Sequence, residues 1–243
     1  MNSLIVGASA GVGRALAGAL AKKGHHLFLV ASDGEDLKAL SSDLHIRYGV
    51  KVEWEAVDLS RLDAPQLKHH FFEKFGELDN LFLIAGLSNM NKDFAQLDPD
   101  EAHRLMQVNF EAPVALSLAF LEGLKERPSA NLVGIGTVAS ARGRSQNTVY
   151  AAAKRGCEFF FEGLAQSLAD SALNVQFYRF GFIDTSMNTS EGGLIPKWSP
   201  EKTAEAIVAN LGKEIPMAYL PSWWRWIMLV FRSIPWFLFR KMG

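Results

Sequence analysis

The sequence of 243 residues predicts an α/β fold, in which a doubly wound parallel sheet lies between two helical layers, followed by an amphipathic helical tail. Two patterns indicate this fold class. Short apolar runs alternate with longer segments of helical pattern along most of the chain. A glycine-rich turn separates the first apolar run from the first helical segment. We expect one domain in residues 1–218 and the tail in residues 219–243.

Each predicted strand is a short and nearly continuous apolar run, as expected for strands that are covered on both faces. The predicted strands are residues 3–6, 27–31, 51–57, 81–84, 132–135 and 175–179. The predicted helices are residues 13–23, 35–48, 64–75, 99–127 and 149–171. This order is typical of a Rossmann-type, three-layer α/β/α fold, whose ligands bind beyond the carboxyl ends of the strands.

The composition excludes several classes of function. Apolar residues make up 49% of the chain, and the net charge of −1 offers no basic excess for a nucleic-acid partner. The six histidines are scattered without the further ligands that zinc needs, so we expect no metal site. The single cysteine, Cys157, excludes an intrachain disulfide and is typical of a cytoplasmic protein. The N-terminal segment lacks the basic region of a secretory signal.

The glycine-rich turn, "GASAGVG", lies between the first predicted strand and the first predicted helix. Glycine allows the backbone to approach a pyrophosphate closely, and the following helix N-terminus offers unpaired N–H groups. The turn therefore predicts a dinucleotide site, and the alternative is a turn with a purely structural role. The residues assigned to the site are Gly7, Ser9, Ala10, Gly11, Val12 and Gly13.

The stretch "NTVYAAAKRG" places Tyr150 and Lys154 four residues apart in a run of alanines. On a helix the two side chains lie one turn apart on the same face, although such a pair also arises by chance. A phenol with a pKa of about 10 is a poor acid or base at neutral pH, and a nearby ammonium lowers that pKa. We therefore expect Lys154 to lower the pKa of Tyr150, so that the phenol exchanges a proton with a carbonyl or an alcohol.

Together with three further features, these motifs resemble the short-chain dehydrogenase/reductase family over about residues 3–190. The features are Asn109 in "LMQVNFEAPVAL", Thr137 thirteen residues before the tyrosine, and the segment "FGFIDTSM" after the sixth strand. The resemblance implies hydride transfer between a nicotinamide and a carbonyl or secondary alcohol. It implies that Tyr150 moves the proton, that Lys154 also holds the nicotinamide ribose, that Thr137 orients the substrate oxygen, and that Asn109 supports the proton path.

The resemblance also assigns cofactor contacts after other predicted strands. Asp58, followed by Leu59, would accept a hydrogen bond from the adenine amino group. The remaining assigned contacts are Ala85 and Gly86 at the adenine-side ribose, and Ile183 and Thr185 at the nicotinamide carboxamide.

The choice between NAD and NADP depends on the end of the second predicted strand, "LVASDGEDL". Asp33 would repel a 2′-phosphate and favour NAD, whereas Ser32 would donate to the phosphate of NADP. Both cofactors therefore stay open at this point.

Several positions depart from the family pattern. Val6 stands in place of threonine, Leu83 and Ile84 replace two asparagines, and Phe180 replaces proline. Thr137 itself replaces the usual serine. These departures leave an alternative function, namely a non-catalytic nucleotide-binding sensor or membrane scaffold of the same fold.

The tail, "YLPSWWRWIMLVFRSIPWFLFRKMG", holds four of the six tryptophans. Arg225, Arg232 and Pro235 interrupt the apolar run, so we do not expect it to span a membrane. A basic polar face beside an aromatic face favours contact with a membrane surface through residues 222–241, at the inner face of the membrane. The alternatives are packing over the substrate site or across a subunit boundary of the homo-oligomer that the resemblance implies.

A membrane-surface tail predicts a hydrophobic or lipid-linked substrate. The segment "ARGRSQNTVYAAAK" and the tail also resemble, more weakly, a subset of the family that includes decaprenylphosphoryl-ketopentose reductases. That resemblance implies a polyprenyl-linked sugar ketone. Simple carbonyls, steroids, ketoacyl groups and retinoids remain alternatives.

Overall fold

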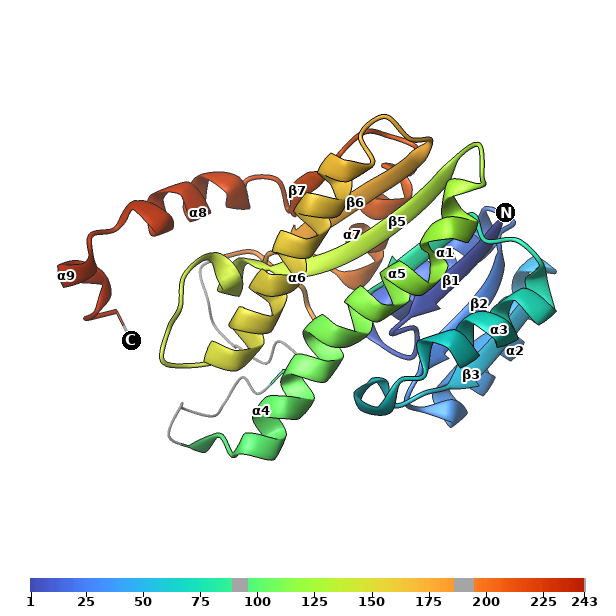
Figure 1. Ribbon diagram of the computed structural model, residues 1–243, viewed down its shortest axis with the longest axis horizontal. Coiled ribbons are helices and arrows are strands. Elements are labelled where there is room, and N and C mark those ends of the chain that lie inside the picture. The colour runs from blue at the N-terminus through green and yellow to red at the C-terminus, as the bar shows by residue number, and fades with distance from the viewer. Residues whose placement is uncertain (89–95, 186–194, 243) are drawn as a thin grey trace.

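The computed structural model describes residues 1–88, 96–185 and 195–242. Its centre is a seven-stranded sheet with the strand order β3-β2-β1-β4-β5-β6-β7, in which every neighbouring pair is parallel. The strands are β1 Asn2–Val6, β2 His26–Ala31, β3 Val52–Ala56, β4 Asn80–Leu83, β5 Ala130–Thr137, β6 Leu173–Phe180 and β7 Met217–Leu220. The predicted doubly wound parallel sheet is therefore confirmed (Figure 1).

Helices cover both faces of the sheet (Figure 1). One apolar core lies beneath α1 (Gly11–Lys22), α2 (Gly34–Tyr48) and α7 (Pro200–Val208). The other lies beneath α3 (Ala64–Phe75), α5 (Ala112–Lys125) and α6 (Thr148–Ser167). The remaining elements are α4 Pro99–Met106, η1 Leu59–Arg61, η3 Gln107–Glu111, η4 Val138–Ala141, α8 Trp224–Ser233 and α9 Trp236–Phe239.

Several helices begin where a short polar side chain caps them. Asp33, Asp63, Asp98 and Ser199 accept hydrogen bonds from backbone N–H groups in the first turns of α2, α3, α4 and α7. Such caps satisfy N–H groups that have no partner within the helix. These start signals explain why the local sequence forms helices at these places.

The C-terminal part of the sheet differs from the prediction. α7 and β7 are not among the predicted elements, and β7 crosses the predicted boundary between residues 218 and 219. β7 has only four residues, three of them partly exposed, and it joins the sheet through pairing with β6. Its four residues are apolar and run directly into the tail, so the pairing with β6 identifies the strand.

After β7 the chain continues into α8 and α9, which extend away from the sheet (Figure 1). Because all strands are parallel and β7 ends here, this tail starts at the carboxyl edge of the sheet. Among the helices of the described residues, none is both long enough and apolar enough to cross a bilayer.

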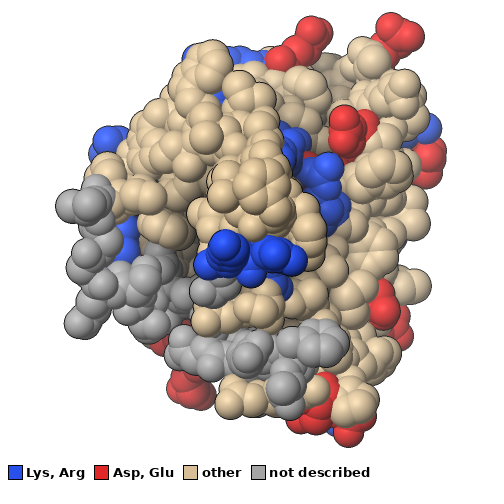
Figure 2. Space-filling model, turned by 90° about the vertical axis from the view of Figure 1, so that its left-hand side faces the viewer, with Lys and Arg blue, Asp and Glu red and all other residues tan. Residues whose placement is uncertain are grey.

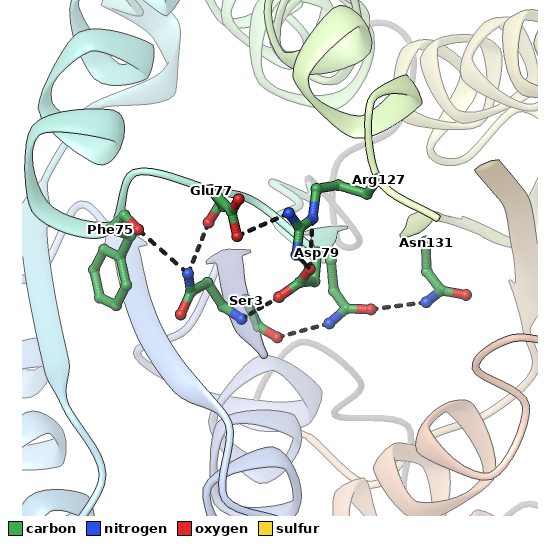
Figure 3. A network of polar contacts seen from close by, with 8 residues as sticks. Ser3, Phe75, Glu77, Asp79, Arg127 and Asn131 are labelled. Atoms are coloured by element: carbon green, nitrogen blue, oxygen red, sulfur yellow. Dashed lines mark hydrogen bonds and ion pairs between the residues drawn. The ribbon is translucent and has the colours of Figure 1, made fainter. Parts of the chain in front are cut away.

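A network of polar side chains joins three strands at their amino ends (Figure 3). Asn80 donates to the Ser3 hydroxyl over 3.1 Å, and Asn131 donates to the Asn80 carbonyl oxygen over 2.8 Å. Next to them, Arg127 donates to the Asp79 carboxylate over 3.0 Å. These side chains are mostly buried and paired, and they lie at the edge opposite the carboxyl ends. We therefore assign them to stability of the sheet rather than to chemistry.

The same edge predicts a dependence of stability on pH. His25 is buried, its Nδ1 lies 2.9 Å from the Ser3 hydroxyl, and burial lowers its pKa to about 4. The His25 imidazole therefore binds a proton less readily in the folded protein than in the unfolded chain, where it is protonated below about pH 6.5. We expect the free energy of unfolding to fall between about pH 6.5 and pH 4, by up to about 3 kcal/mol from this group.

The measurement is urea denaturation at both ends of that pH range. His25→Gln should lose this part of the pH dependence, whereas His69→Gln, at an exposed position of α3, should keep it. An equal pH dependence in the wild type and in His25→Gln would contradict the assignment.

Candidate active site

A cavity of about 310 Å³ lies at the carboxyl ends of the central strands. Its size is in the range of small-molecule and cofactor sites. All the turn residues predicted from the sequence line this cavity, namely Gly7, Ser9, Ala10, Gly11, Val12 and Gly13. The glycine turn therefore forms one wall of the site.

The turn is packed so closely that its glycines cannot carry a side chain. Gly7 has φ +96°, and a Cβ atom there would lie 2.5 Å from the Ala85 nitrogen. A Cβ atom at Gly13 would lie 1.9 Å from the Gly7 carbonyl oxygen. Ala10 precedes α1 without a side-chain cap, so the first N–H groups of α1 have no side-chain acceptor from the cap residue. A close-packed turn before an uncapped helix N-terminus fits the pyrophosphate of a dinucleotide.

This packing predicts opposite effects for two substitutions on α1. Gly13→Ala should destabilise the fold by about 1–3 kcal/mol and weaken nucleotide binding by about tenfold or more, because the turn must move away from Gly7. Gly18→Ala should stabilise the fold by about 0.5–1 kcal/mol, because a Cβ atom there meets nothing within 4 Å. Thermal unfolding and fluorescence titration with NADPH measure both effects. Unchanged nucleotide binding in Gly13→Ala would contradict the assignment of this turn to the pyrophosphate.

Asp58 and Leu59, which the resemblance assigns to the adenine, also line the cavity. Hydrogen bonds from the Ser60 backbone and hydroxyl lower the pKa of Asp58. Asp58 thus stays a carboxylate that can accept a hydrogen bond. Arg104 and Val108 also line this cavity, and neither was predicted from the sequence. No local pattern marks these two residues, because only the tertiary fold brings their segment to the cavity.

The two candidates for cofactor choice lie in different places. Ser32 lines the cavity, whereas Asp33 is not among its lining residues. The Asp33 carboxylate instead accepts a hydrogen bond of 3.0 Å from the Asp36 backbone N–H and caps α2. In the structure, therefore, Ser32 faces the cavity and Asp33 does not, although the sequence left both as candidates for the choice between NAD and NADP.

Asn109 lies in a wide π-helical turn, η3, between α4 and α5. The predicted single helix over residues 99–127 is thus three helical segments. The Asn109 amide donates to the carbonyls of Leu87 and Leu105 over 2.8 and 3.0 Å, and its oxygen accepts from the Leu87 N–H over 3.2 Å. Because Leu87 lines the cavity, the buried asparagine holds one wall of the site in place.

Lys154 is buried beside the same wall. Its Nζ donates to the carbonyls of Ala85 and Ile135 over 3.2 and 3.4 Å, and both of these residues line the cavity. A Cβ atom at Gly86 would lie 3.4 Å from Asn109 Oδ1 and 3.6 Å from Lys154 Nζ. Asn109 and Lys154 therefore both lie next to Gly86, where a Cβ atom would point. Burial lowers the pKa of Lys154.

The phenol of Tyr150 lies near the Thr137 side chain, so the structure brings these two candidates together. Burial raises the pKa of Tyr150 to about 12, and the nearby Thr137 side chain acts in the opposite direction. The expectation that Lys154 lowers this pKa is wrong for the arrangement described. Loss of water around the phenol dominates, and the ammonium of Lys154 is engaged by two backbone carbonyls.

Thr137 begins the short turn η4. Its hydroxyl accepts from the Ala139 N–H over 3.1 Å, and its carbonyl accepts from the Ser140 hydroxyl over 2.7 Å. The Ser140 hydroxyl is therefore used within the turn. At the far side, Ile183 and Thr185 line the cavity, and a Cβ atom at Gly11 would lie 3.2 Å from Thr185 Cγ2. This contact brings the end of β6 to the glycine turn.

Comparisons with known proteins identify the family. The family model described as short chain dehydrogenase matches residues 2–193. The 3-oxoacyl-[acyl-carrier-protein] reductase FabG of Salmonella typhimurium is 28% identical over 185 residues, which are 76% of this chain and 74% of the relative.

Two solved structures have the same fold. The alcohol dehydrogenase from the archaeon Thermococcus sibiricus, complexed with 5-hydroxy-NADP, is 26% identical with a TM-score of 0.80, and the match covers 90% of this chain and 94% of that one. A short-chain dehydrogenase from Sphingobium yanoikuyae, in complex with NADPH, is 24% identical with a TM-score of 0.83, over 97% of this chain and 96% of that one.

Proposed function

The chain belongs to the short-chain dehydrogenase/reductase family and is an NAD(P)-dependent oxidoreductase, and from this premise we propose that it acts on a hydrophobic or lipid-linked carbonyl compound or secondary alcohol. The single observation that carries the substrate class is the exposed apolar face of the tail, which starts at the same edge of the sheet as the cavity. A substrate that partitions into lipid would meet such a surface before it reaches the cavity.

In the proposed reaction, the bound nicotinamide supplies or accepts the hydride. Tyr150 is protonated at neutral pH, since its pKa is about 12, and it would donate this proton to the carbonyl oxygen during reduction. Thr137, whose side chain lies near the same phenol, would orient the substrate oxygen. Lys154 would provide positive charge beside the ribose, and Asn109 would hold the wall at Leu87.

The experiment on substrate class is a series of methyl ketones with increasingly long alkyl chains, assayed by nicotinamide absorbance. We expect kcat/KM to rise by about tenfold for each added pair of methylenes, because each buried methylene contributes about 0.8 kcal/mol. A kcat/KM that is flat or falls with chain length would overturn the hydrophobic-substrate proposal and leave the family's redox activity in place.

For the cofactor, we propose a preference for NADP. The neutral hydroxyl of Ser32 lines the cavity at the end of β2, while the Asp33 carboxylate caps α2. An acid that faces the ribose would repel a 2′-phosphate, and a hydroxyl does not. Fluorescence titration should show NADPH binding about tenfold more tightly than NADH. Equal or tighter binding of NADH would contradict this preference.

The outer face of α8 supports peripheral contact with the inner face of a membrane. Trp226, Leu229 and Val230 are 58%, 59% and 68% exposed, although a surface helix normally turns polar residues outward. In α9, Trp236 and Phe237 are 68% and 61% exposed. Figure 2, which faces this end of the molecule, shows uncharged surface around a group of Lys and Arg.

The charge of the tail favours anionic lipid. No Asp or Glu follows Glu214, and four cations do, namely Arg225, Arg232, Arg240 and Lys241. Juxtamembrane cations contribute about 1 kcal/mol each on an anionic surface. The protein should float with vesicles that contain phosphatidylglycerol and stay behind with pure phosphatidylcholine. Absence of flotation with both kinds of vesicle would contradict the proposed membrane contact.

We also propose a homo-oligomer that forms through α5 and α6. Leu118 on α5 and Phe159 on α6 are 56% and 75% exposed, and the two helices are neighbours on one face of the sheet. Light scattering should give at least a dimer for the wild type and a smaller species for Phe159→Glu. A monomeric wild type would contradict the proposal.

A further inference from the structure

One arginine side chain joins the tail to the turn that carries Thr137. Arg142 donates through Nη1 to the backbone carbonyls of Phe231 and Ile234. Its guanidinium also lies 3.7 Å from the centre of the Phe239 ring. Phe231 is in the last turn of α8, Ile234 is its C-cap residue, and Phe239 ends α9. Arg142 therefore holds both helices of the tail.

The contact has a clear physical basis. The last carbonyls of a helix have no partner within the helix and carry a partial negative charge. A guanidinium that donates to them satisfies two acceptors and complements the helix dipole. Its planar face is left to lie on an aromatic ring, which adds a cation–π contact.

Arg142 comes directly after η4, the turn that Thr137 directly precedes as its N-cap residue. Val138 in this turn clusters with Trp224 and Met228, the buried residues of α8. The turn therefore touches the tail at two places, through an apolar contact at the start of α8 and through Arg142 at its end. The other element that α8 contacts closely is β7, from which it starts.

Such a tail is a segment of low local stability, because few buried residues attach it to the body. A partner that binds the outer face of the tail would make the tail more ordered. A residue that contacts both the tail and the Thr137 turn would then make that turn more ordered as well. The outer face is apolar and the flanking charges are positive, which fits an anionic bilayer.

We propose that Arg142 is a positioning residue that couples the membrane-bound state of the tail to the Thr137 turn, so that an anionic membrane orders the catalytic turn. This inference rests on the proposed membrane contact. It predicts that lipid acts on turnover through residues 137–142, and not only by concentrating a hydrophobic substrate.

Hydrogen exchange measured by mass spectrometry tests the coupling without any substrate. The full chain is compared with and without vesicles of phosphatidylglycerol and phosphatidylcholine, as the wild type, Arg142→Gln and Arg144→Gln. Arg144 is exposed and lies two residues away, so its variant loses the same charge in the same segment. We expect vesicles to slow exchange of residues 224–239 in all three proteins. Exchange of residues 137–142 should slow by about tenfold in the wild type and Arg144→Gln only.

The outcomes separate the coupling from the membrane contact. Protection of the tail without protection of residues 137–142 in the wild type would overturn the coupling and leave the membrane contact standing. No protection of the tail would overturn both. Equal protection of residues 137–142 in the wild type and Arg142→Gln would show that the signal does not pass through Arg142, which also overturns the proposal.

A second measurement distinguishes positioning from a merely structural cap. With a dodecyl methyl ketone and NADPH, vesicles should raise kcat of the wild type, and Arg142→Gln should lose this rise while its dissociation constant for NADPH stays within about twofold. Arg142→Lys, which keeps the charge but not the planar fork, should restore part of it. If Arg142→Gln does not fold, Phe239→Leu removes the ring on the tail side, and a full vesicle response in that variant would overturn the coupling.

Discussion

Replacement of Tyr150 by Phe is expected to lower kcat for ketone reduction by about 10²- to 10⁴-fold while leaving the affinity for NADPH unchanged. The substitution removes one oxygen and keeps the ring. The phenol lies near Thr137, and its pKa of about 12 keeps it protonated, so we propose it as the proton donor to a carbonyl oxygen. The effect should therefore fall on the chemical step and not on nucleotide binding.

The matched control is Tyr48→Phe, which removes the same oxygen at the end of α2, outside the residues that line the cavity. It should retain the wild-type kcat. The measurement combines steady-state kinetics of a methyl ketone with fluorescence titration of NADPH. A Tyr150→Phe enzyme that turns over within about threefold of the wild type would remove Tyr150 from the proposed mechanism.

Replacement of Lys154 by Met is expected to lower both kcat and the affinity for NADPH, the latter by about tenfold. Methionine has a similar length and no charge. It would leave the carbonyls of Ala85 and Ile135 without their donor, and both residues line the cavity at the ends of β4 and β5. Loss of the buried ammonium should also reduce kcat by about 10²-fold or more, because the nicotinamide ribose would lose the cation that is proposed to hold it in position.

The control for charge and length is Lys38→Met on the exposed face of α2, which should behave as the wild type. Circular dichroism distinguishes the local loss of the Lys154 donor from unfolding of the sheet. If Lys154→Met keeps its NADPH affinity and only its kcat falls, the lysine does not position the cavity wall for nucleotide binding. If both stay unchanged, its assigned role is wrong.

Most of the fold followed from local pattern. Each of the six predicted strands corresponds to a strand of the sheet. Five of them are mostly buried, and β3 at the sheet edge is not. The helices α2, α3 and α4 start at capping residues, because a short carboxylate can satisfy N–H groups that the helix cannot. The sheet neighbour β7 and its helix α7 were missed, since pairing with β6 and packing on α1 define them more than their own residues do.

The candidate site divides in the same way. The glycine turn and the spacing of Tyr150 and Lys154 were visible because close backbone approach and a helical turn each demand particular residues at particular separations. Arg104 was not visible, because a cation on a helix has no local sign of the cavity it lines. Asp33 and Ser32 were equally good candidates for the cofactor ribose in the sequence. Only the structure distinguishes them, because the Asp33 carboxylate caps α2 by accepting from the Asp36 N–H.

The sequence by itself determined the α/β order, the glycine turn and the residues that carry the proposed chemistry, because strand burial, turn geometry and helical spacing are properties of neighbouring residues. The tertiary structure alone decided the pKa of Tyr150, the wall that Asn109 and Lys154 hold, and the attachment of the tail to Arg142. Those depend on burial and on groups far apart in the chain. The 89 residues that separate Arg142 from Phe231 carry no local sign that the two meet.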